Sequence, residues 1–561
     1  MKRFISIADF TEKGGWILDS QYIELMGLPY LLAHGLGNPV ADAKGTVKIS
    51  QSGSYHVYAY TYNWNAPWKP EYAPGIYEVT IGGYKNVFGD KGEAWGWQDG
   101  GEFFFEEGTH ELVLHDLTGY EGRIGALLIT NEVPEPVQSY IQMPETAAAE
   151  YDYVVVGGGI AGITAALSAA RSGLKTALVQ DRPVLGGNNS SEVRVWLSGK
   201  YCFDRFPKLG RITSELEQKV AKMHGTDNAA SNYEDDMKYR TVTREENITL
   251  YLCHSVVGVE KEANSIKQIV VMDLEKCQNI RLSAPLYADC TGDGVLAVYA
   301  GADYEVTPSG HMELSNFWCI EDTGVEQNFA RCPWAIDLTS VDFPGRLRAN
   351  GTDSEGERQS ARTLGCWRWG AGFEHHPILK AEYARDTNFR AMYGVWDALK
   401  NVDGDFKTYK ISQSCHISGK RESRRFLGPV ILTTHDIVHK TDFDDALIGI
   451  DWALDMHTPH RKYYSTFVEG DAFFCTDCDS RWNPPCFMPY RCLYSRNIEN
   501  LFFAGRNISV THDALSPVRV MRTCGMMGET IGKAAYLCKE YGLSPDGVYS
   551  EKLEELLAFF R

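Results

Sequence analysis

The stretch YDYVVVGGGIAGIT, Tyr151–Thr164, decides how this chain folds. Its run Tyr153–Val156 is rich in β-branched residues and ends at three glycines, which is typical of a buried strand in a parallel sheet. Gly157, Gly159 and Gly162 follow the GxGxxG spacing, which permits a tight turn, close approach to a pyrophosphate, and close helix–strand packing. The helix that begins there would direct free N–H groups and its positive dipole end at phosphates.

The next strand, Lys175–Gln180, completes a β-α-β unit. A glycine motif alone also occurs in purely structural turns, but in this context it predicts dinucleotide binding. An acidic side chain at the end of the second strand usually binds the ribose hydroxyls. Here Gln180 occupies that position and Asp181 follows it, so we expect the ribose contact from one of these two side chains.

Composition limits the function classes. A length of 561 residues suggests about three domains. The net charge of -19 argues against nucleic acid or an anionic membrane as a partner. No apolar run reaches the ~18 residues of a membrane span, and the first residues lack the apolar segment of a secretory signal. The 14 cysteines are scattered, with none before Cys202, which indicates reduced thiols in a cytoplasmic protein.

Residues 1–140 have the pattern of an all-β domain. Polar and apolar residues alternate in Tyr55–Tyr60, and similar short runs are separated by turn residues about every ten positions, which predicts an antiparallel β-sandwich. Its layout is analogous to carbohydrate-binding domains. The domain carries four tryptophans near predicted loops: Trp64, Trp68, Trp95 and Trp97. These would pack the domain or, alternatively, offer platforms to a sugar ring, and we favour packing. Residues 132–149 are expected to be a linker.

Two later blocks repeat the pattern of a strand that runs into glycine. In Leu286–Tyr304, the glycines of the TGDG sequence permit close backbone approach, and Asp293 is placed either at a cofactor or as the cap of the next helix. Leu501–Phe503 is a second short strand that ends at Gly505 and Arg506. A long helix rich in small residues is expected from about Val518.

The segment between these blocks, residues 304–487, is expected to form a separate domain. Its most charged stretch is Cys415–Pro429, with Arg421, Glu422, Arg424 and Arg425. Because this cluster lies between a glycine and an apolar run, we interpret its arginines as partly buried groups that hold an anionic substrate group or a phosphate. The alternative is a solvated surface. His416, at the start of the stretch, is a candidate proton carrier.

Four cysteines near the end of this segment and just beyond it are candidate metal ligands: Cys475, Cys478, Cys486 and Cys492. Their spacing fits no zinc pattern. A redox-active pair remains an alternative, but ordinary packed thiols are the preferred interpretation, and no metal site is expected.

Together, VVVGGGIAG, LGGNNSSEVR, ADCTGDG, GKRESRR and NLFFAGRNISVTHDAL resemble the bacterial FAD-dependent oxidoreductase family. Some of its members are labelled xanthan-lyase-like, and fumarate-reductase-type flavoproteins are relatives. The resemblance covers about Tyr151–Tyr541. It implies an α/β fold in which a Rossmann-like FAD domain of the two-dinucleotide-binding type contains an inserted substrate domain and follows the all-β sandwich. The expected boundaries are 1–140 for the sandwich, 150–303 and 488–561 for the FAD domain, and 304–487 for the substrate domain.

The resemblance also implies which residues hold FAD. They come from the glycine motif, the end of the second strand, the LGGNNSS segment, the TGDG sequence and the last block, whose long helix would point its N-terminus at the flavin ring. The expected cofactor-binding residues are Gly157, Gly159, Gly162, Gln180, Asp181, Gly186, Gly187, Asn188, Ser190, Ser191, Asp293, Gly505, Arg506 and Arg519.

The resulting hypothesis is an enzyme that passes a hydride from a small polar substrate to the flavin. His512 would remove the substrate's hydroxyl proton, with His416 as the second choice, and Arg424 or Arg425 would orient the substrate. A carbohydrate or glycoside is the expected substrate class. Without a second GxGxxG motif, electrons would leave to an external acceptor, and a homo-oligomer is compatible with the sequence. The alternatives are a reductase of C=C bonds and a carbohydrate-binding or lyase-type protein with structural FAD.

Overall fold

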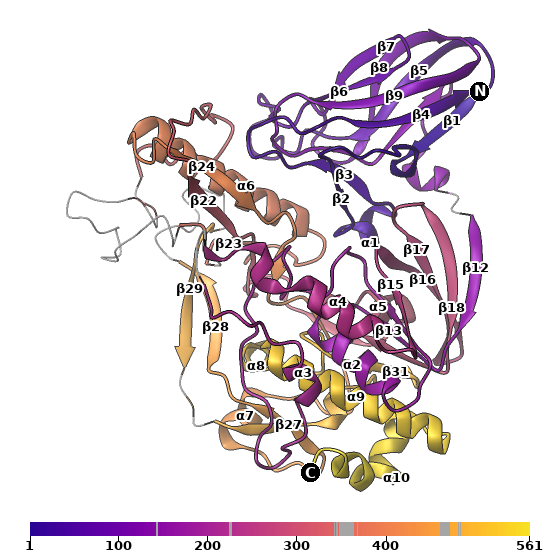
Figure 1. Ribbon diagram of the computed structural model, residues 1–561, viewed down its shortest axis with the longest axis vertical. Helices are drawn as coiled ribbons and strands as arrows, with labels where there is room; N and C mark the ends of the chain where they lie inside the picture. Colours follow the sequence, from indigo (N-terminus) through magenta and orange to yellow (C-terminus); the bar gives the residue numbers. More distant parts are fainter. Residues whose placement is uncertain are drawn as a thin grey trace.

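The computed structural model describes residues 1–141, 144–223, 227–341, 343, 346, 364–366, 368–460, 472–480, 482 and 484–561. Figure 1 shows the N-terminal strands in indigo at the top, the segment around helix α6 (Ala381–Asp397) to the left, and the C-terminal helices in yellow below. The parallel sheet lies beside these yellow helices.

The N-terminal residues form antiparallel sheets. One has the order β1-β11-β5-β8, namely Lys2–Ser6, Ala126–Thr130, Gly53–Thr61 and Gly96–Phe105. A second has the order β4-β9-β6-β7, namely Ala43–Ile49, Gly108–Asp116, Tyr77–Ile81 and Tyr84–Phe88. A three-stranded sheet contains β10 (Gly122–Ile124), β3 (Tyr30–Ala33) and β2 (Ile17–Asp19). Burial alternates along β4 and β5, so that Val47, Val57 and Ala59 enter a core shared by the two larger sheets.

The segment expected as a linker contains a strand. β12 (Glu145–Glu150) pairs in parallel with β18 (Gln278–Ser283), at the edge of a sheet completed by β17 (Ser265–Asp273) and β16 (His254–Glu262). The prediction was wrong here because this alanine-rich strand has no hydrophobic alternation and depends on the hydrogen bonds that its neighbour supplies. The other two strand pairs of this sheet are antiparallel.

The glycine motif lies in a five-stranded parallel sheet with the order β15-β14-β13-β19-β31. These strands are Ile248–Tyr251, Thr176–Val179, Tyr153–Val156, Leu286–Asp289 and Leu501–Phe503. Every residue of β13, β14, β19 and β31 is buried, as expected for strands covered on both faces. Since β31 comes from the last block of the sequence, two distant parts of the chain build one sheet.

The C-terminal helix is two helices rather than one. α8 (His512–Val518) ends before the extended residue Val520, and α9 (Met521–Tyr541) begins after it. α9 packs on α2 (Ile160–Ala170), the helix that follows the glycine motif. The last helix, α10, is Pro545–Ala558. In the described part of the chain, no helix combines the length and apolar character needed to cross a membrane.

The described part of residues 304–487 forms several small sheets. The paired strands are β20 (Tyr304–Val306) with β26 (Arg424–Phe426), β22 (Trp318–Asp322) with β24 (Tyr409–Ser414), β27 (Ala446–Ile450) with β30 (Cys486–Pro489), and β28 (Leu454–Pro459) with β29 (Cys475–Ser480). β21 (Leu314–Ser315) lies between β23 (Gly370–Ala371) and β25 (Gly419–Lys420). β21 and β23 contact α6, whereas β27 contacts the C-terminal helix α9 and shares the core of the parallel-sheet region. The aromatic core around α6 includes Trp318 and Trp396 and is continuous with Trp64 of the N-terminal region.

Candidate functional site

A cavity of about 390 Å³ lies at the carboxyl ends of the parallel strands. Val156, Val179, Cys290 and Gly505 line it, and each stands at or just after the end of its strand. In open α/β sheets, ligands bind in the crevice outside these ends. The remaining walls come from residues 20–25, 193–198, 417–421 and 519–524.

The three glycines of the motif have separate roles. Gly157 has φ +102°, and a Cβ there would lie 2.4 Å from the carbonyl carbon of Cys290. A Cβ on Gly162 would lie 1.7 Å from the Gly157 oxygen, so only glycine allows the helix to pack this closely. Gly159 differs, because its nearest neighbour would be 3.8 Å away. It is also the N-cap of α2 and has no side chain to satisfy the helix N–H groups, which leaves them for a ligand.

Of the two residues expected to contact a ribose, Asp181 presents its side chain to the cavity more openly than Gln180 does. The Gln180 side chain is buried, accepts a hydrogen bond from the Gly158 N–H at 2.7 Å, and donates one to the Val184 oxygen at 3.1 Å. It therefore holds the glycine turn together and is not available to a ribose. The Asp181 side chain lines the cavity and is 44% exposed.

The segment after β14 turns along the cavity as predicted, but not all of its polar residues reach it. Gly186, Gly187 and Asn188 line the cavity, and the Asn188 amide donates to the Lys420 oxygen at 3.3 Å. Ser190 and Ser191 do not line it. The Ser190 hydroxyl donates to the Gly187 oxygen at 2.7 Å, and the Ser191 N–H donates to the Asp235 carboxylate at 3.2 Å. These two serines shape the loop instead of contacting a ligand.

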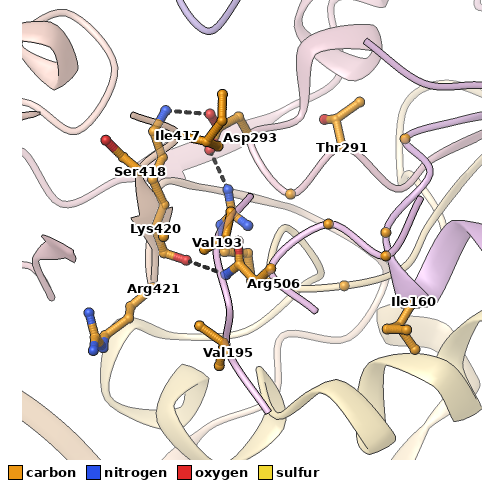
Figure 2. A pocket seen from close by; sticks show the side chains of 18 of the residues that line it. Ile160, Val193, Val195, Thr291, Asp293, Ile417, Ser418, Lys420, Arg421 and Arg506 are labelled. Atoms are coloured by element: carbon orange, nitrogen blue, oxygen red, sulfur yellow. Dashed lines mark hydrogen bonds and ion pairs between the residues drawn. The ribbon is translucent and has the colours of Figure 1, made fainter. Parts of the chain in front are cut away.

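Asp293 lies between two cations at the middle of the cavity. Its carboxylate accepts hydrogen bonds from Lys420 Nζ at 2.5 Å and from Arg506 Nη2 at 2.7 Å, as Figure 2 shows. Burial raises the pKa of Asp293, but the two cations outweigh it and hold that pKa well below its usual range. The alternative role of a helix cap is taken by the Thr291 hydroxyl, which accepts from the Gly294 N–H at 2.8 Å. Lys420 was missed as a site residue.

A chain of charged groups forms the far end of the cavity. Arg421 lies 2.8 Å from Glu313 Oε1, and this oxygen is 2.9 Å from His457 Nδ1. His457 Nε2 lies 3.5 Å from Asp455, which is 3.8 Å from Arg519. Burial alone would raise the pKa of both carboxyl groups, but the neighbouring charges and hydrogen bonds outweigh it. Arg421 and His457 hold the pKa of Glu313 well below its usual range. The hydrogen bond from His457, together with the charges of His457 and Arg519, lowers the pKa of Asp455 to about 2.

Of these five residues, Arg519 was predicted to bind the cofactor, and Arg421 was predicted, with the other arginines of its cluster, to hold an anionic substrate group or a phosphate. The other three were missed. Glu313 precedes β21, Asp455 and His457 lie on β28, and neither stretch has a recognisable motif. Figure 2 shows the Arg421 side chain directed away from Asp293, so that the two neighbours Lys420 and Arg421 serve different parts of the cavity.

The four side chains predicted to be catalytic do not line the cavity: His512, His416, Arg424 and Arg425. His512 Nδ1 lies 2.8 Å from Glu422, which also pairs with Arg425 at 2.5 Å. The Glu422 hydrogen bond raises the pKa of His512. Arg424 pairs with Glu24 at 3.0 Å, and burial lowers the pKa of His416 to about 3. His512, Arg424 and Arg425 are directed to carboxylate partners, which the sequence pattern alone does not reveal.

The tryptophans join the N-terminal sheets to the α6 segment. Trp64 is 1% exposed and contacts Trp334, with ring centroids 5.5 Å apart. Trp68 stacks on Tyr383 of α6 with a centroid distance of 4.5 Å. The remaining two also donate to protein acceptors: Trp95 to Glu382 and Trp97 to the Glu135 oxygen. These contacts agree with the packing interpretation.

The cysteines whose side chains are described are all free thiols. Cys475, Cys486 and Cys492 are buried. The side chain of Cys478 lies outside the described residues. Glu313, His457 and Cys475 offer three possible metal-ligand atoms within 4.8 Å of one another. Since Arg421 already neutralises Glu313, this group is better suited to holding a proton than a cation.

Comparison with known protein families gives a match that covers most of the chain. The family model described as "FAD dependent oxidoreductase" matches residues 152–557. A pseudooxynicotine dehydrogenase from Pseudomonas sp. is 52% identical over 44 residues, which is 8% of this chain and 9% of that protein.

Solved structures give weaker similarities. One is a geranylgeranyl bacteriochlorophyll reductase-like protein of Thermoplasma acidophilum, with 13% identity and a TM-score of 0.35, over 73% of this chain and 84% of that one. Another is the quinol fumarate reductase FrdA of E. coli, with 12% identity and a TM-score of 0.32, over 73% and 74%. Scores this low support no conclusion about function.

Proposed function

Because the chain belongs to the family of FAD-dependent oxidoreductases, we propose that its FAD extends from Asp181 past the glycine turn to Arg421, and that a small polar substrate binds beyond it. The observation that carries this proposal is that one continuous cavity is lined both by the glycine turn and by the charged groups Arg421, His457 and Arg519. A cofactor bound at the glycine turn and a substrate bound at the charged groups would therefore lie next to each other.

The residues present fit such a cofactor. The free N–H groups at the start of α2 suit a pyrophosphate, and the open side of Gly159 allows its close approach. The Asp181 carboxylate is placed to accept hydrogen bonds from ribose hydroxyls. Arg519 and the N-terminal end of α9 line the opposite end of the cavity, where they favour negative charge. When bound, FAD supplies the acceptor or donor of a hydride.

His457 is the proposed proton carrier, in place of His512. It lines the cavity between two carboxylates, Glu313 and Asp455, which fix the orientation of its ring. Arg421 and Arg519 would orient an anionic or polyhydroxylated substrate. A hydroxylated anion, a class that includes sugar acids, has both a hydroxyl group for His457 to deprotonate and a negative charge for the two arginines to bind. With the tryptophans used in packing, a neutral carbohydrate has less support than it had from the sequence.

A reductase of activated C=C bonds is the second candidate. Arg421 and Arg519 lie at the same end of the cavity, and a substrate-bound guanidinium is able to stabilise the charge that develops during such a reduction. The two candidates differ in the electron donor. A hydroxyl-oxidising enzyme bleaches its flavin band, near ~450 nm, with substrate alone, whereas a reductase requires an external reductant. A protein with structural FAD shows neither response.

The proton carrier is tested by comparing two histidine substitutions. His457→Asn is expected to slow anaerobic flavin reduction by about 10²–10⁴-fold, because it removes a general base, while the bound flavin spectrum is retained. His512→Asn is the matched control, because His512 does not line the cavity, and its rate is expected to stay within about threefold. Stopped-flow absorbance with a panel of hydroxy acids and sugar acids measures both. A slow His512→Asn variant with a fast His457→Asn variant would reverse the assignment.

A further inference from the structure

We propose that residues 20–25 of the N-terminal region form part of the FAD site and cover the adenine of the cofactor. This segment includes α1 (Ile23–Met26) apart from its last residue. The inference rests on the FAD placement proposed above but not on the substrate or the proton carrier. It assigns the N-terminal region a role in cofactor binding.

The position of the adenine follows from the strand that binds the ribose. Asp181 is the second residue after the end of β14, so we place the adenosine end of a bound dinucleotide beside it. Residues 20–25 line the same cavity as Asp181, Arg182 and His254. The Ser20 hydroxyl donates a hydrogen bond to the Asp181 carbonyl oxygen at 3.2 Å. The N-terminal region therefore touches the residue that marks the ribose.

Two side chains tie the segment to the other cavity walls. Gln21 donates to the His416 oxygen at 3.1 Å and accepts from the Ser418 N–H at 2.8 Å. Glu24 pairs with Arg424 at 3.0 Å, and the same guanidinium nitrogen donates to the Asp293 oxygen at 3.1 Å. The segment is thus connected to both the TGDG turn and the 417–421 wall.

Packing holds α1 in place from the other side. Ile23 is 7% exposed and belongs to a small apolar cluster with Met272 and Leu274, next to the sheet that contains β16 and β17. Figure 1 shows α1 between the N-terminal strands and this sheet. A wall that is rigid before the ligand arrives loses little conformational entropy on binding.

The chemistry of the exposed surface suits an adenine. Leu25 lines the cavity but is 43% exposed, and Ile23 lines it on the same short helix. Sites for small ligands are lined mainly by apolar side chains, with a few polar groups that fix the ligand's orientation. The faces of an adenine ring provide an apolar surface, whereas its ribose and phosphates require polar groups.

The test combines a substitution with its matched control. Leu25→Asp places a charge against the proposed adenine position, and we expect the dissociation constant for FAD to rise about tenfold or more, which corresponds to at least about 1.4 kcal/mol. Val133→Asp makes the same change at a side chain that is 87% exposed and does not line the cavity, so its FAD affinity should equal that of the wild type. Quenching of FAD fluorescence on titration into apoprotein measures both constants.

Amide hydrogen exchange on the unmodified full chain, with and without FAD, supplies the second measurement. FAD is expected to slow exchange in residues 20–25 as well as in the glycine turn at 157–162. Protection of the glycine turn alone, with unchanged FAD affinity in Leu25→Asp, would overturn this inference and leave the proposed FAD placement standing. Protection of neither segment would remove both.

Discussion

His416 makes folding sensitive to pH. Burial, the largest effect, lowers its pKa to about 3 in the folded protein, against about 6.5 in an unfolded chain. His416 takes up a proton more readily in the unfolded chain than in the folded protein. Its contribution to the free energy of unfolding is therefore complete above pH 6.5, and it falls by about 1.4 kcal/mol per pH unit below pH 6.5 until the pKa of the folded protein is reached. Urea unfolding at pH 7, 6 and 5 should show a shallower decline for His416→Asn than for the wild type. Parallel declines in the two proteins would contradict the assigned pKa.

The sequence predicts the role of a residue where the backbone conformation permits only one residue type. Gly157 and Gly162 occupy positions where a Cβ has no room, so the local pattern carries the information. Gln180 shows the limit, because its distance from Gly158 depends on how the turn folds back onto the strand. The sequence points to His512 as the proton carrier instead of His457 for the same reason, because the position of a side chain depends on how distant segments fold together. Which histidine reaches the cavity is decided by contacts with Glu422 and Glu313, which lie far away in sequence.

Among the elements, α2 and α9 pack closely together beside the glycine turn that lines the cavity. A Cβ on Gly528 would lie 2.1 Å from the Ala161 oxygen and 2.2 Å from Thr164 Oγ1. Gly528→Ala must therefore push the two helices apart, and we expect a loss of about 1–3 kcal/mol in unfolding free energy. FAD should also bind more weakly, because the start of α2 moves.

Gly96→Ala is the control for this helix contact, since its added Cβ has no neighbour closer than 3.8 Å. Urea unfolding and FAD titration of both variants give the comparison. Equal stability of the two would mean that the helices adjust without cost.

The sequence predicts the close packing of the last helix from its small residues, but not its division into α8 and α9. Val520 is extended because its neighbours turn toward the cavity, and nothing in the local sequence requires this. β12 shows the same dependence on context. Strands with strong alternation or dense β-branched residues, such as β5 and β13, were identified because their own side chains determine which face is buried.

At the scale of the whole molecule, the N-terminal region is joined to α6 by buried ion pairs. Arg385 lies 2.8 Å from Asp19, and both side chains are fully buried. Arg123 pairs with Asp386 at 3.0 Å and with Glu382 at 2.8 Å. The sequence predicts a sandwich at 1–140, followed by a linker, and a substrate domain at 304–487, with no sign of contact between them, because ion pairs between distant segments leave no trace in local composition. The structure shows a charged and aromatic interface that includes Trp64.

This interface should make the two regions unfold together. Arg385→Met leaves the Asp19 carboxylate buried without its cation, and breaking such a pair costs about 3–5 kcal/mol. The control is Lys85→Met, because Lys85 is 68% exposed and pairs with Glu78 on the surface, where a pair contributes at most about 1 kcal/mol.

Urea unfolding followed by tryptophan fluorescence and by far-ultraviolet circular dichroism should give coincident transitions in the wild type. In Arg385→Met, the fluorescence transition should come first, since Trp64, Trp68 and Trp95 report on the interface. A variant that keeps coincident transitions and loses less than about 1 kcal/mol would show that aromatic packing alone unites the regions.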